Sequence, residues 1–459
     1  MTQAVILAAG RGERFQELTE DKPKPLIQLL GLTLIERVIL TAKQVGVTDF
    51  VIVVGYQGDK IQKHLGSGEK LGVKITYVEN KEWKKGNGVS LSKTKKFVQR
   101  NFLLLMSDHI FDESVLARLL KENVEGNKVV LVVDRNIENN EFVDEKDATK
   151  VLVKEDKIVD IGKSLREYNA YDTGIFYCPP LLFDALEKSM KKGDDSLTGG
   201  IKALAEKGCV RTLDIQKGFW VDVDNEKLLQ KTQALLLSKL KKPSDGPVSR
   251  YLNRPVSTRI TKWLSKKNIT PNQITVGSFL LCCLSTLFFL LGGDINLALG
   301  GLIAQISSIV DGCDGEIARL KFLETEFGSW IDAVLDRYAD AFLIIGLIFY
   351  VYLLDKNLMF LLIGFFSLLG TFMSSYTADK YDGFMKKQLQ SKGHYLRVGR
   401  DVRIFLIFVF TMISLPLSLF IDTLFLIMSL LLLLAVLTNG ENLRRIILMH
   451  KVNTLGCCL

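Results

Sequence analysis

Cysteine is scarce in this chain of 459 residues, and its seven cysteines never take the CxxC spacing of a metal site. A disulfide framework and a structural zinc site are therefore not expected. The final residues, 456–459, do not form a CaaX prenylation box, because Gly456 occupies the position of the modified cysteine. Internal repeats and low-complexity tracts are also missing, which argues against a repeat architecture.

The first seven residues lack the basic stretch and the long apolar run of a secretory signal peptide. We therefore expect a β-strand at this position, and a first half of the chain that stays in the cytoplasm. The overall net charge is +8, and we expect no nucleic-acid partner.

Composition divides the chain into two unlike halves. A mean hydropathy of +0.20 is high for a protein in which 24% of the residues are charged. Residues 1–235 mix charged and apolar residues, whereas long apolar runs dominate from about residue 273. We predict a cytoplasmic domain over 1–235, a linker with a juxtamembrane amphipathic helix over 236–272, and a membrane domain over 273–459.

Short β-rich runs alternate with amphipathic helical stretches in the first half. Predicted strands cover 4–8, 50–55, 73–78, 102–106 and 129–133, and predicted helices cover 33–45, 59–64 and 89–98. This alternation is typical of βαβ units and predicts a Rossmann-like α/β domain with a mainly parallel sheet. Later strands near 148–153, 170–177 and 210–215 should extend the sheet along the acceptor side of a cleft.

The second half begins with a polar linker at 241–247 and a basic amphipathic stretch at 254–267, which we expect to lie along the membrane surface. Six apolar runs follow, at 273–292, 296–312, 328–353, 358–377, 402–420 and 423–440. A membrane-spanning helix needs about 20 apolar residues, so we predict an all-α domain of six transmembrane helices. Lysine and arginine gather in the connections on one side, and the positive-inside rule then predicts a multi-pass cell-membrane protein with cytoplasmic termini.

A loop rich in small residues follows the first predicted strand. Its backbone N–H groups can surround phosphate oxygens, and an arginine adds a neutralising charge. The loop lacks the third glycine of a dinucleotide-binding loop and the Gly-Lys-Ser/Thr of a P-loop. Lys24 follows in a Lys-Pro-Lys-Pro-Leu segment, and this combination is far more specific than Gly-x-Gly alone. The candidate nucleotide-binding residues are Leu7, Ala8, Ala9, Gly10, Gly12 and Arg14.

This combination resembles the nucleotidyltransferases that make NDP-sugars and CDP-alcohols, over residues 3–235. The resemblance implies that Lys24 is catalytic and contacts the reacting phosphates, and that Asp108 and Asp222 bind Mg²⁺ or Mn²⁺. Asp224 is a rival for the role of Asp222, and His109 is interpreted as incidental. Attack by a phosphate monoester on a phosphorus atom brings anions together, so cations are needed to screen them.

Other residues of the first half are assigned by the same resemblance. Gly86 lies near the base pocket, but its Gly-Asn-Gly segment replaces the family's Gly-Thr-Ala, so the base cannot be predicted there. Lys150, Lys163 and Asp172 lie where the family binds its acceptor. Lysines suit an acceptor phosphate, although exposed lysines are usually only solvated.

Four acids in the second half have a regular spacing. Asp311 and Asp314 are three residues apart, and Asp332 and Asp336 are four apart, so each pair lies on one face of a helix. The first pair ends one apolar segment and the second begins the next, so all four can meet at the cytoplasmic end. Oxygen ligands alone suit Mg²⁺ or Mn²⁺, and acids so close to the membrane need a compensating cation.

The acid pattern matches the signature of the CDP-alcohol phosphotransferases, over about residues 250–445. The resemblance implies metal binding by these four acids, with Asp336 also acting as general base for the acceptor hydroxyl. Asp340, one turn further, is expected only to hydrogen-bond a neighbouring helix. The implied nucleotide pocket consists of Gly315, Ala318, Arg319 and Gly328. Basic residues for the acceptor phosphate are Lys380, Arg397, Arg400 and Arg403, with attraction to anionic lipid as an equal alternative.

The order of the two halves resembles the bifunctional inositol-1-phosphate cytidylyltransferase/di-myo-inositol phosphate phosphate synthases, whose product is converted downstream to a compatible solute. That resemblance implies CTP, inositol 1-phosphate and a CDP-alcohol intermediate as ligands, and a homodimer formed through a membrane domain in lipid. Two alternatives remain open. One is a CDP-alcohol pathway for another phosphorylated alcohol, such as phosphocholine, with a lipid acceptor. The other is a transporter with a nucleotide-binding regulatory domain, which the clustering of the acids at one membrane face disfavours.

Overall fold

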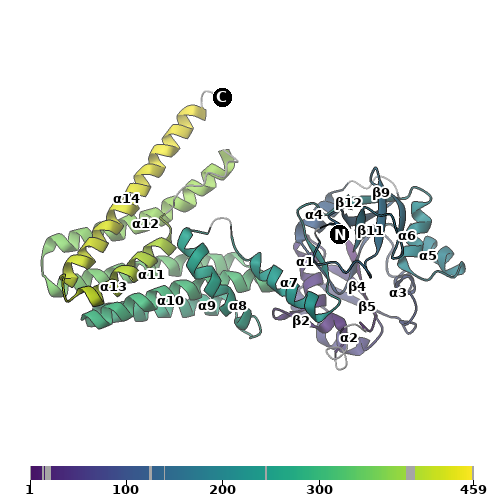
Figure 1. The fold of residues 1–459 in the computed structure, drawn as a ribbon, viewed down its shortest axis with the longest axis horizontal. Helices are drawn as coiled ribbons and strands as arrows, with labels where there is room; N and C mark the ends of the chain where they lie inside the picture. Colours follow the sequence, from purple (N-terminus) through teal and green to yellow (C-terminus); the bar gives the residue numbers. More distant parts are fainter. Residues whose placement is uncertain are drawn as a thin grey trace. The chain divides into compact units, whose positions relative to one another are not determined.

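The computed structural model describes residues 2–12, 15, 22–122, 127–138, 140–242, 245–388 and 398–456. The chain forms two compact units, Met1–Leu236 and Leu237–Leu459, which are considered separately (Figure 1).

The first unit is built on a nine-stranded sheet. In spatial order its strands are β5 (Lys74–Glu79), β4 (Asp49–Val54), β1 (Gln3–Ala8), β6 (Phe102–Met106), β11 (Ala170–Cys178), β8 (Val129–Asp134), β12 (Val210–Asp214), β10 (Lys157–Gly162) and β9 (Lys150–Lys154). The first four strands are parallel, as predicted.

The other half of the sheet is parallel only in part: β8 and β12 pair parallel, but two strands run in the opposite direction. β11 runs antiparallel to both β6 and β8, while β10 runs antiparallel to β9 and β12. A tight hairpin joins β9 to β10 through Glu155 and Asp156, both with positive φ, and such a turn forces the two strands to be antiparallel. The sheet is therefore mixed.

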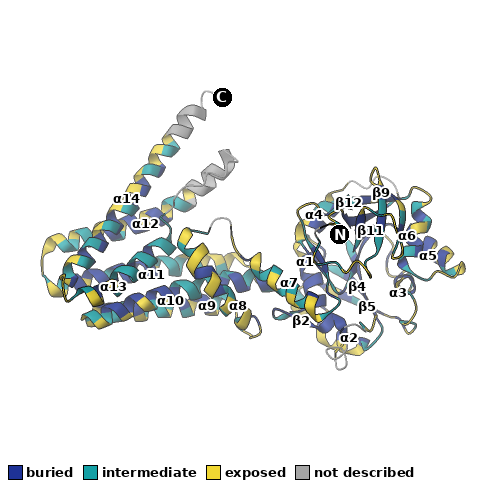
Figure 2. Cartoon of the chain, viewed as in Figure 1, coloured by how far each residue is buried: buried dark blue, intermediate teal, exposed yellow. Residues whose placement is uncertain are grey.

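Helices cover both faces of the sheet. On β1, alternate side chains enter different hydrophobic clusters: Ile6 points to one face and Val5 to the other. The first cluster also includes residues of α1 (Leu34–Gln44), α2 (Gly58–Leu65) and α4 (Glu113–Lys121). The second includes residues of α3 (Asn87–Ser92), α5 (Leu181–Lys191) and α6 (Leu197–Ala205). Buried residues accordingly follow the strands in Figure 2.

Short elements complete this unit and position the site. They are η2 (Lys24–Leu26), β2 (Gln28–Leu29), β3 (Leu32–Thr33), η3 (Glu69–Leu71), β7 (His109–Phe111), β13 (Trp220–Asp222) and α7 (Glu226–Ser238). The predicted helix at 89–98 is shorter than expected, because α3 ends at Ser92. α1 begins where predicted, since Thr33 and Glu36 form a capping box at its first turn.

The second unit is helical (Figure 1). Its elements are η4 (Ser249–Asn253), α8 (Arg254–Leu264), α9 (Pro271–Leu291), α10 (Asp294–Lys321), α11 (Glu326–Leu354), α12 (Leu358–Gln388), α13 (Arg400–Leu417) and α14 (Thr423–Gly456). Local sequence signals explain the starts of α9 and α11. Thr270 caps α9 ahead of Pro271, and the side chain of Thr325 accepts a hydrogen bond from Gly328 N at the start of α11.

Among the residues that the structure describes, five helices are long and apolar enough to cross a membrane: α9, α10, α11, α12 and α14. α13, which corresponds to the fifth predicted span, is not one of them. Arg400, Asp401 and Arg403 all lie in its first turn. The fifth predicted run started at residue 402, whereas α13 begins at Arg400, so both arginines lie in the helix.

Candidate active sites

The first candidate site lies at the carboxyl end of β1, where the parallel neighbours β4 and β6 also end. Leu7, Ala8 and Ala9 are buried at the end of the strand, and Gly10 is exposed. Gly12 has φ +69°, and a Cβ on it would lie 2.7 Å from the Cβ of Lys24. Glycine is therefore needed for the loop to pass over this lysine. Arg14 lies outside the described residues.

Lys24 is surrounded by carboxylates. It is only 6% exposed, and its Nζ donates to Asp108 Oδ2 and Asp224 Oδ1 at 2.6 Å each. Asp222 Oδ1 lies 3.6 Å from the same Nζ. Burial alone would lower the pKa of Lys24, but the three carboxylates outweigh burial and raise it. Lys24 is therefore a fixed positive charge, and Asp224, the rival of Asp222, is as close to it as Asp108.

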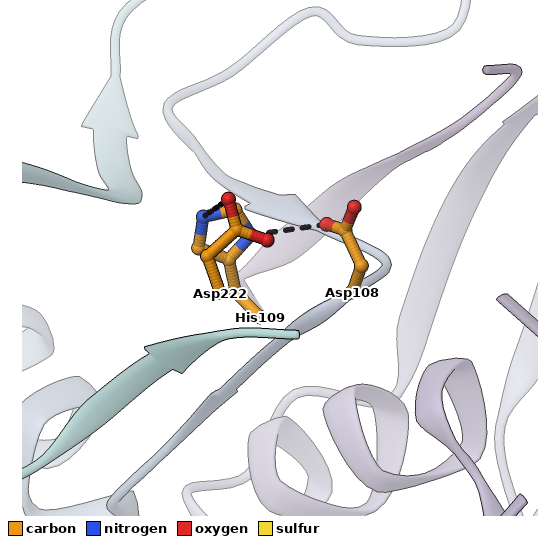
Figure 3. Close-up of side chains that lie close together, drawn as sticks. All are labelled: Asp108, His109 and Asp222. Carbon is orange, nitrogen blue, oxygen red and sulfur yellow. Dashed lines mark hydrogen bonds and ion pairs between the residues drawn. The ribbon is translucent and has the colours of Figure 1, made fainter. Parts of the chain in front are cut away.

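His109 belongs to this cluster, although the sequence had suggested an incidental role. The short strands β7 and β13 pair antiparallel, with His109 directly opposite Asp222. Nδ1 of His109 lies 3.0 Å from Asp108 Oδ1, and its Nε2 lies 3.8 Å from Asp222 Oδ2 (Figure 3). The ring stacks on Trp220, at 5.9 Å between centroids. Burial would lower the pKa of His109, but the two aspartates raise it to about 9.

The first cluster fits a divalent cation. Asp108, His109 and Asp222 each offer a ligand atom, and these atoms lie within 4.8 Å of one another, although His109 must first lose the proton that the two aspartates stabilise. Within the described part of the chain, Asp222 Oδ1 is buried without a hydrogen-bond partner. Burial raises the pKa of Asp222 to about 6, against the influence of His109. A bound cation would satisfy the oxygen and favour its charged form, so the residues suit Mg²⁺ or Mn²⁺.

A cavity of about 190 Å³ adjoins this cluster. Asp172 and Lys163 line it, as do His109 and Asp222. Burial raises the pKa of Asp172 to about 6, while Oδ1 accepts a hydrogen bond from Gly174 N. Lining residues that the sequence analysis missed are Asn87, Asp144, Asp147, Thr149 and Thr198. Asp144, Asp147 and Thr149 lie outside helices and strands, in a segment without a recognisable motif, so no sequence signal marked them.

Two other predicted residues are held by different contacts. Lys150 is not among the residues that line the described cavity; its Nζ lies 4.9 Å from the ring centroid of Tyr168. Gly86 N donates to Asp195 Oδ2, and a Cβ on Gly86 would collide with the backbone of Asp195. The glycine is thus explained by close packing of two loops, and its role in nucleotide binding stays a prediction.

The second candidate site joins two helices of the second unit. Asp311 and Asp314 near the end of α10, and Asp332 near the start of α11, place oxygens within 4.8 Å of one another. α9 supplies hydroxyl donors: Ser278 Oγ donates to Asp311 at 3.0 Å, and Thr275 Oγ1 donates to Asp314 at 2.6 Å. The helical spacing and the turn between α10 and α11 therefore bring the three acids together.

This group also fits a divalent cation. Its three acids offer only oxygen atoms, as Mg²⁺ and Mn²⁺ prefer. Asp332 Oδ1 is buried and has no hydrogen-bond partner in the parts of the chain that are described. A buried carboxylate oxygen without a donor is costly, and a cation is the simplest group that would satisfy it.

Asp336 is placed differently from these three acids. Its Oδ1 lies 2.6 Å from Nη1 of Arg400, which also lies 2.6 Å from Asp311 Oδ2. Arg400 thus connects the predicted base to the three-acid group. Asp340 lies one helical turn further along α11 than Asp336 and pairs with both Arg400 and Arg403. It therefore contacts α13, as expected of a residue that faces a neighbouring helix.

The other residues predicted for this site are Gly315, Ala318, Arg319, Gly328, Lys380 and Arg397. Arg319 Nη2 donates to Leu240 O at 3.3 Å, and a Cβ on Gly315 would lie 3.1 Å from Arg319 Nη1. Ala318 is partly buried on the same helix, and a Cβ on Gly328 would press on the capping hydroxyl of Thr325 at 2.9 Å. Lys380 is exposed on α12, with Nζ 5.9 Å from the ring centroid of Tyr376, and Arg397 lies outside the described residues.

A buried glutamate that the sequence analysis missed anchors α8 to α10. Glu316 is fully buried and accepts hydrogen bonds from Ser257 Oγ and Thr261 Oγ1, at 2.6 Å each, and from Arg254 Nη1 at 2.7 Å. Arg254 also makes two 2.9 Å hydrogen bonds to Asp245 in the linker. The face of the predicted amphipathic helix that carries Arg254, Ser257 and Thr261 therefore packs on protein, together with Ile260 and Leu264. Whether its other face lies on a membrane stays a prediction.

Comparisons with known proteins cover both units. The family model for nucleotidyl transferases matches residues 3–238, and the model for CDP-alcohol phosphatidyltransferases matches residues 268–450. A protein of Aquifex aeolicus named bifunctional IPC transferase and DIPP synthase is 36% identical over 454 residues, which are 98% of each chain. A protein of the same name from Thermococcus kodakarensis is 34% identical over 443 residues, 95% of this chain and 94% of its own. A solved inositol-1-phosphate CTP transferase from T. maritima is 30% identical, with a TM-score of 0.46, over 51% of this chain and 94% of its own.

Proposed function

Because this chain belongs to the family of bifunctional IPC transferases and DIPP synthases, we propose that it catalyses two successive transfers with one activated intermediate. The chain is a transferase with a nucleotidyltransferase domain and a CDP-alcohol phosphotransferase domain. The first domain joins CTP to inositol 1-phosphate, giving CDP-inositol and pyrophosphate. The second transfers phosphoinositol from CDP-inositol to another inositol 1-phosphate and releases CMP.

The first step is assigned to the cluster around Lys24. A phosphate oxygen of inositol 1-phosphate attacks the α-phosphorus of CTP, and the bond to the β-phosphate oxygen breaks. Lys24 stabilises the charge that accumulates on the phosphates, and Asp108, Asp222 and His109 would hold a cation, which supplies further charge neutralisation when bound. The polar part of the lining of this cavity consists mainly of carboxylates, the amide of Asn87 and the hydroxyls of Thr149 and Thr198, which suit the hydroxyl groups of a cyclic polyol.

The second step is assigned to the cluster of α10 and α11. Asp336 accepts the proton of the acceptor hydroxyl, whose oxygen forms a bond to the β-phosphorus of CDP-inositol while CMP leaves. Asp311, Asp314 and Asp332 would hold the cations on the diphosphate, and such cations supply charge neutralisation. Arg400, in contact with Asp336, is placed to receive the acceptor's phosphate.

One observation carries this proposal: each unit of a single chain contains a three-residue cluster suited to a divalent cation, one beside a buried lysine and one between two apolar helices. The first arrangement suits nucleotide activation and the second suits consumption of the product. CTP follows as the nucleotide because the second domain uses CDP-alcohols.

The membrane arrangement is part of the same proposal. We place six helices across the membrane, in contact with lipid. One of them is α13, which carries charged residues in its first turn. Both termini and both sites then face the cytoplasm, as the distribution of lysine and arginine favours. The second unit mediates a homodimer. Cross-linking of the purified protein in vesicles, and labelling of single cysteines from either side, test these placements.

Phosphorus NMR tests the two reactions directly. The purified full chain is incubated with CTP, Mg²⁺ and one of several phosphorylated alcohols, including inositol 1-phosphate and phosphocholine. Pyrophosphate, CDP-inositol and then CMP with a phosphodiester are expected for inositol 1-phosphate alone. A diacylglycerol acceptor is added in a parallel reaction. Preference for phosphocholine, or transfer to the lipid, would contradict the proposed substrates, and absence of CTP consumption would contradict the first step.

A further inference from the structure

A buried ion-pair network lies one helical turn deeper than Asp336. Asp340 is 5% exposed and Arg403 is 4% exposed, and Asp340 Oδ2 lies 2.6 Å from Arg403 Nη2. The other oxygen, Oδ1, lies 3.3 Å from Nε of Arg400. One carboxylate of α11 thus holds two arginines of α13.

The contact with Arg400 fixes the direction of its guanidinium group. Asp340 binds Nε, at the stem of that group, while the terminal Nη1 contacts Asp311 and Asp336 at 2.6 Å each. A guanidinium group is planar, so fixing Nε on one side and Nη1 on another leaves it little freedom to rotate. Asp340 therefore determines which edge of Arg400 faces the site.

Arg403 is held by the same carboxylate, away from the three-acid group. Its Nη2 also lies 3.4 Å from Ser375 Oγ on α12, and its Nη1 lies 3.4 Å from Val398 O. Its Nε is buried and lacks a hydrogen-bond partner among the described residues. Arg403 neutralises the charge of Asp340. Arg400 therefore keeps its contact with Asp336 while it also pairs with Asp340.

We propose that Asp340 is a positioning residue of the transfer site, which aims Arg400 so that the phosphate of the acceptor binds beside the base Asp336. This inference rests on the proposed function, which makes that acceptor a phosphate monoester. Arginine binds phosphate through two N–H groups of defined direction, so a change in the orientation of the guanidinium group weakens acceptor binding. The nucleotide substrate binds through other residues and is unaffected.

Steady-state kinetics on the full chain test this role. Asp340→Asn keeps the shape of the side chain and removes its charge. We expect the KM for inositol 1-phosphate in the second step to rise roughly ten- to a hundredfold. This change corresponds to the loss of one hydrogen bond to a charged group. The affinity for CDP-inositol should stay within about twofold of wild type, which also shows that the second unit is folded. Asp355→Asn, directly after the other end of the same helix, is the matched control.

Asp340→Glu keeps the charge but moves it by one methylene, and should recover part of the acceptor affinity. An unchanged acceptor KM in Asp340→Asn, or equal weakening of both substrates, would overturn the inference. If Asp340→Asn fails to bind CDP-inositol, Asp340→Glu decides alone: a raised acceptor KM supports positioning and an unchanged one refutes it. Failure of the wild-type chain to form the phosphodiester would instead contradict the proposed function, so the two failures are distinguishable.

Discussion

Replacing Lys24 with methionine should abolish the first reaction and spare the second. Methionine keeps much of the apolar stem but removes the ammonium group, which lies 2.6 Å from both Asp108 and Asp224 and 3.6 Å from Asp222. Three carboxylates then remain around an uncharged side chain. Because Lys24 is 6% exposed, water cannot replace the lost charge easily.

The burial of Lys24 determines both the expected loss of rate and the expected loss of folding stability. Loss of one preorganised charge at a reacting group costs about 2.7–4 kcal/mol of transition-state stabilisation, a decrease in rate of roughly a hundred- to a thousandfold. Breaking a buried ion pair by removing one partner costs about 3–5 kcal/mol of folding stability. A divalent cation competes with Lys24 for the same carboxylates, so metal affinity should be equal or tighter in the variant.

Three measurements on the full chain separate these effects. Pyrophosphate release from CTP reports the first step, transfer from supplied CDP-inositol reports the second, and Mn²⁺ titration reports the cation. Lys63→Ala, an exposed lysine on α2, is the control. If Lys24→Met retains more than about a tenth of pyrophosphate release, the role of Lys24 is refuted. If a folded variant loses both reactions equally, the two sites are not independent.

Three further outcomes are expected. A fragment of residues 1–236 should be soluble and release pyrophosphate from CTP, because the whole first cluster lies within it; a folded but inactive fragment would contradict this. Asp336→Asn should retain CDP-inositol binding but lower turnover about a hundred- to ten-thousandfold, whereas Asp311→Asn should weaken Mg²⁺ and nucleotide binding together in titrations. Gly12→Ala should impair CTP binding in calorimetry, because the residue has φ +69° and its Cβ would lie 2.7 Å from the Cβ of Lys24.

Local sequence patterns predicted most elements of the first unit. Runs of β-branched residues identified β1, β4 and β8, because each of these strands is buried on both faces of the sheet. Strand direction depends on how distant segments pair, and the pattern of β11 contains no such information. The same limit explains His109, whose position in the site depends on the pairing of β7 with β13, more than 100 residues apart in the chain.

Helical spacing predicted the acids of the second unit but not their partners. Residues three apart lie on one helix face, so Asp311 and Asp314 share a face. Their convergence with Asp332 then required only a short turn between the two helices. Arg400 and Arg403 lie at the border between a charged stretch and the fifth predicted run, so the sequence did not show which acids they face. In the structure, Gly399 precedes the first turn of α13, and the two arginines of that turn point to acids more than 60 residues earlier in the chain.

The placement of Asp340 shows why a buried charge implies a partner that the sequence alone cannot name. Asp332, Asp336 and Asp340 follow one another at four-residue intervals, so the last lies about 12 Å further along α11 than the first. An acid within a membrane-spanning helix costs about 2.5–3.5 kcal/mol, and an opposite charge on a neighbouring helix offsets much of that cost. On energetic grounds alone, any basic residue at that end of the helical bundle could supply the charge opposite Asp340. Only the packing of α13 selects Arg400 and Arg403, and the same packing brings Arg400 to Asp336, so a contact that stabilises the fold also orients a group at the site.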